Sequence, residues 1–393
     1  MQATAFTKDK SGRLLKSQQG YWAFIPDPLP PKLELNWEFV NQISEADRRL
    51  SELAGVARTL PNPHLLIRPF IRREAVLSSK IEGTVASLSD LMSFEALGVA
   101  HSDRSDVREV HNYVNALEYG LERLAELPIS SRLFGELHER LMRGARGEHL
   151  TPGEFRRSQN WIGPPGCLLK DATFVPPPEA EMKEALSDLE NYIHAESHLP
   201  PLVRLGLIHY QFEAIHPFLD GNGRIGRLLI TLLLCADGLL PQPLLYLSAF
   251  FERHRDAYYR LLLEVSQNGN WSEWLTFFLR GIAEQSLDAL TRANHLQELS
   301  VRYREILHEK KASATLLRLA DSLFMNPVVN PTVTAKAFKL TYVSAQKNID
   351  KLVDAGILRE ITGRQRGRIY VAGSIIDVLE RQDALQLKLK LQG

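Results

Sequence analysis

The sequence has little cysteine, no long apolar run and no excess of either charge. Its two cysteines, Cys167 and Cys235, are too few for a disulfide framework and lack the spacing of a metal site. The longest apolar run, from Leu228 to Ala236, is far shorter than the roughly 18 residues that span a bilayer. The first residues, MQATAFTKDK, lack the apolar stretch of a secretory signal. We therefore expect a cytoplasmic protein without a membrane segment.

The charges balance over the whole chain but not along it. Lys and Arg together number 47, as do Asp and Glu, so the net charge favours no class of partner. From Lys310 to the end there are 14 basic and 7 acidic residues, a net +7 that leaves −7 for the rest. A basic tail on an acidic body indicates an anionic partner for the tail.

Helical periodicity dominates the chain and predicts a mainly α fold. The proline-rich Ile25–Lys32 indicates an extended arm, and the helix that follows should end or bend at Gly55. Five segments are expected: an N-terminal arm and helix over 1–60, a helical region over 61–125, a central core over 126–300, a small domain over 310–375 and a terminal helix or tail over 376–393.

One stretch within the helical body has a different pattern. Residues 153–178 contain two β-prone pieces, QNWI and ATFV, on either side of a Gly/Pro loop. This pattern predicts a β-hairpin on the helical body.

The C-terminal pattern predicts a winged helix-turn-helix. Helices are expected over 312–324, over 333–340 and in VSAQKNIDKLVDAG, followed by two strands, ILREI and RIYVA.

Basic side chains gather on this predicted domain. Lys347 and Lys351 share a face of the third helix, and Arg364, Arg366 and Arg368 lie at the wing tip. They suit phosphate contacts to DNA, but winged helices also bind proteins, so both partners stay open.

The most polar stretch of the chain is HPFLDGNGRIGR, His216 to Arg227, directly before the apolar run. Its glycines let the chain turn sharply, and the helix that follows aims unpaired N–H groups and a partial positive charge at the turn. Arg224 and Arg227 lie on one face of the first helical turn. Together these groups are typical of a polyphosphate site.

Two further side chains suit transfer of a phosphoryl or nucleotidyl group. Asp220 offers the carboxylate oxygen that Mg²⁺ prefers, and His216 is the group there that accepts a proton near neutral pH. A lone histidine or a GNG turn is commonly structural, but packing alone would not select two arginines and an aspartate at these offsets.

This stretch resembles the signature of Fic-domain proteins, H-x-F-x-[DE]-G-N-G-R-x-x-R, without departures. The resemblance implies a helical Fic fold with a β-hairpin flap. It also implies a nucleotidyltransferase that moves AMP from ATP, with Mg²⁺, to a Tyr, Thr or Ser hydroxyl of a target protein and of itself.

The resemblance also assigns roles to residues. His216 would be the general base and Asp220 the Mg²⁺ ligand. The residues that would contact the nucleotide are Gly221, Asn222 and Gly223 as the anion hole, Arg224 at the inner phosphates, Arg227 at the γ-phosphate, Gly226 between the two arginines, and Tyr258 and Tyr259 near the base.

A second motif, SSKIEG, spans Ser78 to Gly83 and reads most simply as a helix end with a terminal glycine. It also resembles the Fic inhibitory motif, [ST]-x-x-x-E-[GN], on an N-terminal inhibitory helix over about 76–83. That resemblance implies that Glu82, in a motif opened by Ser78, pairs with Arg227 in the place of the γ-phosphate.

The predicted hairpin resembles the flap with which Fic proteins align their targets. Ala172, Thr173 and Phe174 would then edge the target groove, since an exposed strand can pair with an added one. An ordinary surface hairpin is the simpler alternative.

Two other functions remain open beside a self-inhibited AMP transferase. One is a DNA-binding regulator that senses nucleotide, for which His216 would not be needed as a base. The other is removal of AMP from a modified protein at the same site. We also expect a homodimer, since helical Fic proteins often self-associate.

Overall fold

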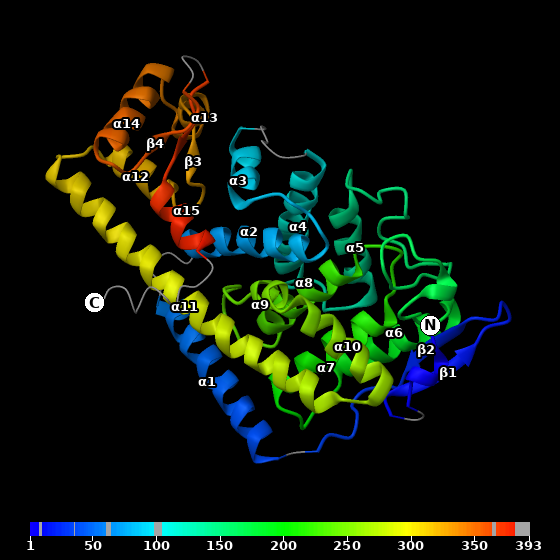
Figure 1. Cartoon of the computed structure of the whole chain (residues 1–393). Coiled ribbons are helices and arrows are strands. Elements are labelled where there is room, and N and C mark those ends of the chain that lie inside the picture. The colour runs from blue at the N-terminus through cyan, green and yellow to red at the C-terminus, as the bar shows by residue number, and fades with distance from the viewer. Residues whose placement is uncertain (8–9, 35, 60–63, 98–103, 364–366, 382–393) are drawn as a thin grey trace. The chain divides into compact units, whose positions relative to one another are not determined.

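The computed structural model describes residues 1–7, 10–34, 36–59, 64–97, 104–363 and 367–381 (Figure 1). The chain divides into two compact units. The first comprises Met1–Ser51, Asn112–Leu240 and Leu247–Gln285, and the second Glu52–His111, Pro241–Tyr246 and Ser286–Gly393. Three helices belong partly to each unit: α1 (Trp37–Thr59), α4 (Arg104–Arg123) and α11 (Trp271–Glu309). None of the described helices is both long and apolar enough to cross a bilayer.

Helices form the core of the first unit, as the periodicity predicts. Two of them, α7 (Pro201–Ile215) and α8 (Asn222–Ala236), pack against each other and bury most of their residues. A helix that is apolar on all sides gains most from such burial. The other helices of this unit are α5 (Ser131–Met142), α6 (Glu179–His194), α9 (Ser248–Arg253) and α10 (Arg255–Asn268).

A β-hairpin stands where the sequence predicted only an arm. Strands β1 (Gly12–Lys16) and β2 (Trp22–Pro26) pair antiparallel, with Leu14 opposite Phe24. The backbone N–H of Phe24 donates to the carbonyl of Val175 at 2.9 Å, so β2 also lies beside the end of the predicted flap. The bond to Val175 joins residues far apart in the chain and cannot be read from the local sequence. The β1–β2 pairing is local, and a prediction resting on the proline-rich Ile25–Lys32 missed it.

The predicted hairpin over 153–178 is present in a reduced form, which we call the flap. Its two β-prone pieces meet at a single antiparallel bridge between Ile162 and Phe174. The intervening loop holds Pro164, Pro165 and a short 3₁₀ helix, η2 (Leu169–Asp171). Prolines have no N–H to donate, so they cannot extend the ladder beyond the bridge.

The second unit contains α2 (His64–Ile81), α3 (Leu88–Leu97) and the C-terminal elements. The latter are α12 (Ala314–Ser322), β3 (Val328–Val329), α13 (Pro331–Phe338), α14 (Tyr342–Asp354), β4 (Arg359–Glu360), β5 (Tyr370–Val371) and α15 (Gly373–Glu380). The three strands form an antiparallel sheet in the order β3-β5-β4. The predicted helices and both predicted strands are present, and β3 is an addition. We call residues 314–380 the C-terminal subdomain.

One predicted helix end is absent, and three predictions concern residues that the structure does not describe. Helix α1 continues through Gly55 to Thr59, so the predicted end at this glycine was wrong. Ala54 and Ala57 are buried beside it, and packing outweighs the roughly 1 kcal/mol that glycine costs a helix. Arg364 and Arg366 lie outside the described residues, as does the tail from 382 onward.

Candidate functional site

The signature begins with a residue in a strained backbone conformation. Helix α7 ends at Ile215, and His216 follows with φ 51° and ψ 62°, in the left-handed region. After a short loop, Gly221 at φ 77° begins α8. The N–H groups of the first turn of α8 therefore face back toward the loop. This conformation costs a non-glycine residue about 1–3 kcal/mol, and residues that adopt it cluster at functional sites.

The tautomer of His216 follows from its hydrogen bond. Its Nδ1 lies 3.2 Å from the carbonyl oxygen of Glu213, which can only accept. Nδ1 therefore carries the proton, and Nε2 is the nitrogen with a lone pair that can accept one. A general base at this position would act through Nε2.

Two side chains from the flap segment hold the backbone of His216. Arg156 donates from Nε to the carbonyl of His216 at 2.9 Å and from Nη2 to that of Pro177 at 2.5 Å. Asn160 donates to the carbonyls of His216 at 3.2 Å and Phe218 at 2.7 Å. Arg156 is fully buried, and burial lowers its pKa to about 10. The root of the flap and the histidine loop are thus one hydrogen-bonded structure.

Asn222 shapes the loop with its side chain. Its Oδ1 accepts from the N–H of Phe218 and its Nδ2 donates to the carbonyl of the same residue, both at 2.8 Å. Both ends of the amide thus take part in closing this loop, while the backbone N–H of Asn222 lies in the first turn of α8, where an anion hole would form.

A buried histidine fixes the opposite side of the loop. The ring of His138 on α5 stacks on Phe218 with centroids 3.9 Å apart. Its Nδ1 accepts from the N–H of Gly153 at 2.9 Å, so its Nε2 donates to the carbonyl of Asp220 at 3.0 Å. Burial lowers the pKa of His138 to about 4, which keeps it neutral. The backbone of Asp220 is thereby held from outside the signature.

A second buried histidine contacts α8 further along. His209 on α7 donates from Nδ1 to the carbonyl of Gly226 at 3.1 Å, and its Nε2 accepts from the hydroxyl of Tyr258 at 2.9 Å. Burial lowers its pKa to about 3. Tyr258 is 1% exposed and belongs to the core, whereas Tyr259 is 41% exposed. The contact of either tyrosine with a nucleotide base stays a prediction.

The two arginines of the signature are buried, and its aspartate is partly exposed. Arg224 and Arg227 are buried in α8, while the side chain of Asp220 is 43% exposed. Nη2 of Arg224 lies 3.7 Å from Oδ1 of Asp220. Buried guanidinium groups at a helix N-terminus favour an anionic ligand.

The flap offers both buried and exposed positions. Ala172 and Phe174 are buried, and Thr173 is exposed. The N–H groups of Thr173 and Phe174 both donate to the carbonyl of Ile162, at 2.9 and 3.0 Å. Trp161 and Ile162 are exposed on the partner piece, at 41% and 39%.

The proposed inhibitory residues lie in the second unit, at the end of α2. Ser78 is fully buried in the helix, and Glu82 follows the last helical residue and is exposed. Gly83 has φ 96°; its N–H donates to the carbonyl of Lys80, and that of Thr84 donates to the carbonyl of Ser79. This is the hydrogen-bond pattern of a glycine-terminated helix, and it fixes the backbone from which Glu82 projects.

The described residues contain no group of three metal-ligating side chains. Asp220 alone suits a cation whose remaining ligands are phosphate oxygens and water, as Mg²⁺ commonly has in nucleotide sites.

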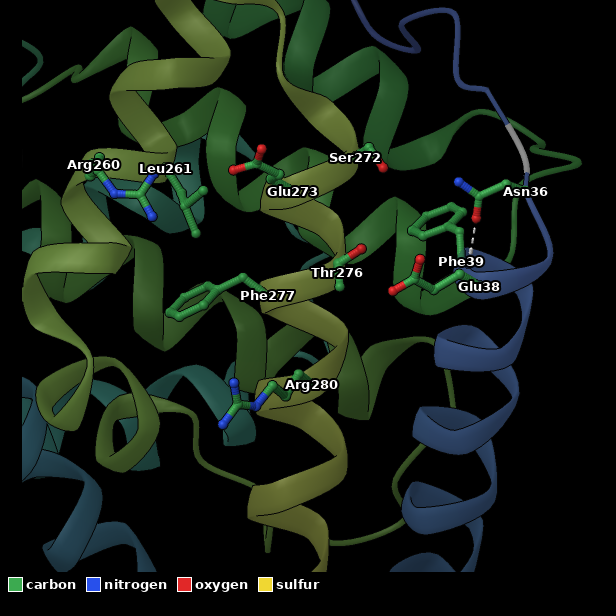
Figure 2. A pocket seen from close by; sticks show the side chains of 10 residues that line it. All are labelled: Asn36, Glu38, Phe39, Arg260, Leu261, Ser272, Glu273, Thr276, Phe277 and Arg280. Atoms are coloured by element: carbon green, nitrogen blue, oxygen red, sulfur yellow. Dashed lines mark hydrogen bonds between the residues drawn. The ribbon is translucent and has the colours of Figure 1, made fainter.

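A hollow of about 380 Å³ lies elsewhere in the first unit (Figure 2). Its lining includes Arg260 and Arg280, which pair with Glu264 and Glu284 on their own helices, and no residue of the signature. Asn36, also in the lining, accepts from the N–H of Phe39 at the start of α1.

Four of these residues were not found from the sequence: His138, Arg156, Asn160 and His209. Arg156 is 60 residues from its partner His216, and His138 is 82 from Asp220. No local pattern could connect such pairs.

Two regions of this chain match a known family in sequence. Residues 40–122 match the Fic/DOC family N-terminal region, and residues 128–234 match the Fic/DOC family itself. Proteins named protein adenylyltransferase Fic from Drosophila willistoni and Culex quinquefasciatus are 28% and 27% identical over 53% of this chain. The match covers only 39% of each of those proteins.

Solved structures agree on the fold. A Fic family protein from Desulfovibrio desulfuricans G20 has a TM-score of 0.56 and 19% identity, covering 88% of this chain and 98% of its own. Fic-1 from C. elegans, residues 134–508, has a TM-score of 0.51 and 23% identity, covering 66% and 74%. With both regions matched and the signature folded as a helix-terminal loop, residues 40–122 and 128–234 form the N-terminal and Fic domains of the Fic/DOC family.

Proposed function

We propose that this protein transfers AMP from ATP to a Tyr, Thr or Ser hydroxyl of a target protein and of itself. The observation that carries the proposal is the orientation of His216, whose Nδ1–H donates to Glu213 and leaves Nε2 as the base beside a helix N-terminus with buried arginines. The relatives named protein adenylyltransferase support this reaction over other phosphate chemistry.

Each step of this transfer can be assigned to a group of the site. Nε2 of His216 takes the proton of the target hydroxyl as its oxygen attacks the α-phosphorus of ATP. The bond from the α-phosphorus to the bridging oxygen breaks, and pyrophosphate leaves. Backbone N–H groups at the start of α8, with Arg224 and Arg227, bind the phosphates and the charge that develops on them. Asp220 would hold Mg²⁺, which supplies further charge neutralisation when bound.

We propose further that Glu82 restrains the resting enzyme by pairing with Arg227, where it takes the place of the γ-phosphate. A carboxylate forms a strong paired hydrogen bond with a guanidinium, which a phosphate would otherwise make. Its position at the end of α2, on a backbone fixed by Gly83, supports this role.

Labelled ATP tests the reaction directly. The Glu82→Gly variant is incubated with ATP carrying radioactive phosphorus at either the α or the γ position. AMP transfer predicts protein-bound label from α-labelled ATP only. Label from γ-labelled ATP would show a kinase, and no label from either in the presence of ATP binding would favour a nucleotide sensor. Incubation with target already carrying AMP separates addition from removal.

A DNA partner for the C-terminal subdomain is a second, separate proposal. Lys347 and Lys351 lie on α14, and Arg368 lies next to β5. A salt-dependent shift of labelled duplex DNA by the full chain would support it, since phosphate contacts release counterions. No shift at low salt would contradict it.

A further inference from the structure

The helix that carries the proposed inhibitory glutamate is fastened to the C-terminal subdomain. Within the second unit, α15 lies beside α2 (Figure 1). Arg73 on α2 donates from Nε to the carbonyl of Leu379, at the end of α15, at 3.0 Å. Two turns further along the same helix, α2 ends and Glu82 follows.

A buried ion cluster completes this attachment. Nη2 of Arg73 lies 3.5 Å from Oδ2 of Asp288 on α11. Asp288 also accepts two hydrogen bonds from Arg292, at 2.8 and 2.9 Å. The side chains of Arg73, Asp288 and Arg292 are 13%, 10% and 1% exposed. One carboxylate thus joins two arginines in a largely dry environment, where pairing is geometrically demanding.

The cluster also binds the end of α15. Arg292 donates to the carbonyls of Val378, Leu379 and Arg381, the last of these at 2.6 Å. The last carbonyls of a helix have no partner within it and carry a partial negative charge, so cations stabilise them. The final helix of the subdomain is therefore held by α2 and α11 together.

A second connection runs through α3. Arg72, next to Arg73, pairs with Glu95 on α3 at 2.5 Å. Asn326 of the C-terminal subdomain donates to the carbonyl of Met92 on α3 at 3.4 Å. Two neighbouring arginines on α2 thus connect it to the subdomain by separate routes.

We propose that the C-terminal subdomain controls the inhibitory helix: α15, held by the Arg73–Asp288–Arg292 cluster, keeps α2 in the position in which Glu82 inhibits. A ligand that displaces α15 would then shift Glu82 and raise AMP transfer. This inference rests on the proposed inhibitory role of Glu82. It assigns the release of inhibition to the subdomain, since a rigid helix passes a displacement along its length.

The test compares initial rates of labelling by the full chain and its variants. Arg73→Gln removes the charge and the donor geometry that join α2 to α15. It should raise the rate roughly 2- to 30-fold, the range of mutations that weaken a coupling. In the Glu82→Gly background it should add nothing, and Arg73→Lys should fall between Arg73→Gln and the unchanged chain. Arg48→Gln, which breaks the exposed Arg48–Glu45 pair within α1, should leave the rate unchanged.

The outcomes separate this inference from the inhibition on which it rests. If Glu82→Gly is fast while folded Arg73→Gln stays at the resting rate, the coupling is wrong and the inhibition stands. If Glu82→Gly itself is not fast, the inhibition fails and the coupling fails with it. A rise in the Glu82→Gly background, or an equal rise in Arg48→Gln, would also overturn the coupling. Thermal melts verify folding. If Arg73→Gln unfolds, the labelling rate of Arg73→Lys is compared with that of the unchanged chain instead.

Discussion

Replacing Arg156 by methionine should slow AMP transfer without unfolding the protein. The guanidinium of Arg156 is buried and donates to the carbonyls of His216, Ile215, Pro177 and Ser158. Methionine fills similar space but donates nothing, so the left-handed backbone of His216 loses its strongest external support.

Two opposing effects set the cost in stability. Removing the buried cation relieves its desolvation, which lowers the pKa from 12.5 to about 10 and corresponds to about 3 kcal/mol. The carbonyls of Ile215 and Pro177 then lose a buried donor, at about 1–3 kcal/mol each. The net change therefore lies between a gain of about 1 and a loss of about 3 kcal/mol, which is smaller than the unfolding free energy of a typical domain. The variant should therefore remain folded.

The assay measures kcat for labelling in the Glu82→Gly background, together with ATP affinity by calorimetry. A base displaced by about 1 Å can cost 100-fold, so we expect a fall in kcat of about 10- to 100-fold with ATP affinity nearly unchanged. Arg157→Met is the matched control, because Arg157 is exposed and pairs with Glu154 at the surface. An unchanged kcat in folded Arg156→Met would refute the positioning role, and an equal loss in Arg157→Met would refute its specificity.

Two further results are expected. Asn222→Ala removes both hydrogen bonds to Phe218 and should lower the free energy of unfolding by about 1–3 kcal/mol, as measured by denaturant titration. It should also weaken ATP binding, as measured by calorimetry. An unchanged ATP affinity would mean that the loop holds its shape without the amide. Acidification should also destabilise the protein between pH 6.5 and 4, because His138 has a pKa of about 4 when folded and about 6.5 when unfolded, so the unfolded state binds more protons in this window. His138 contributes about 3 kcal/mol to that loss, and a His138→Gln variant should show a shallower pH dependence of its melting temperature; an identical slope would contradict the assignment.

The sequence predicts what depends on local pattern and fails where distant residues meet. Helix α8 and its glycine-rich start follow from an apolar run after HPFLDGNGRIGR, and the C-terminal helices follow from their periodicity. The bond from Phe24 of the β1–β2 hairpin to Val175 does not follow from a local pattern, because the two residues lie far apart in the chain. Gly55 marks no helix end because burial of its neighbours outweighs its local preference.

The site shows the same division. The residues of the signature were found as one stretch, but the side chains that hold it in shape come from α5, α7 and the flap segment. His138, Arg156 and Asn160 look ordinary in their local sequence. Their role arises only when the fold brings them to the carbonyls of the loop.

The most direct test of the account is His216→Ala in the Glu82→Gly background, with labelling from α-labelled ATP and ATP affinity measured on the same preparation. The account predicts that transfer falls by about 100- to 10,000-fold, the contribution of a general base, while ATP affinity changes little. Transfer that persists at the parental rate in a protein that still binds ATP would contradict it.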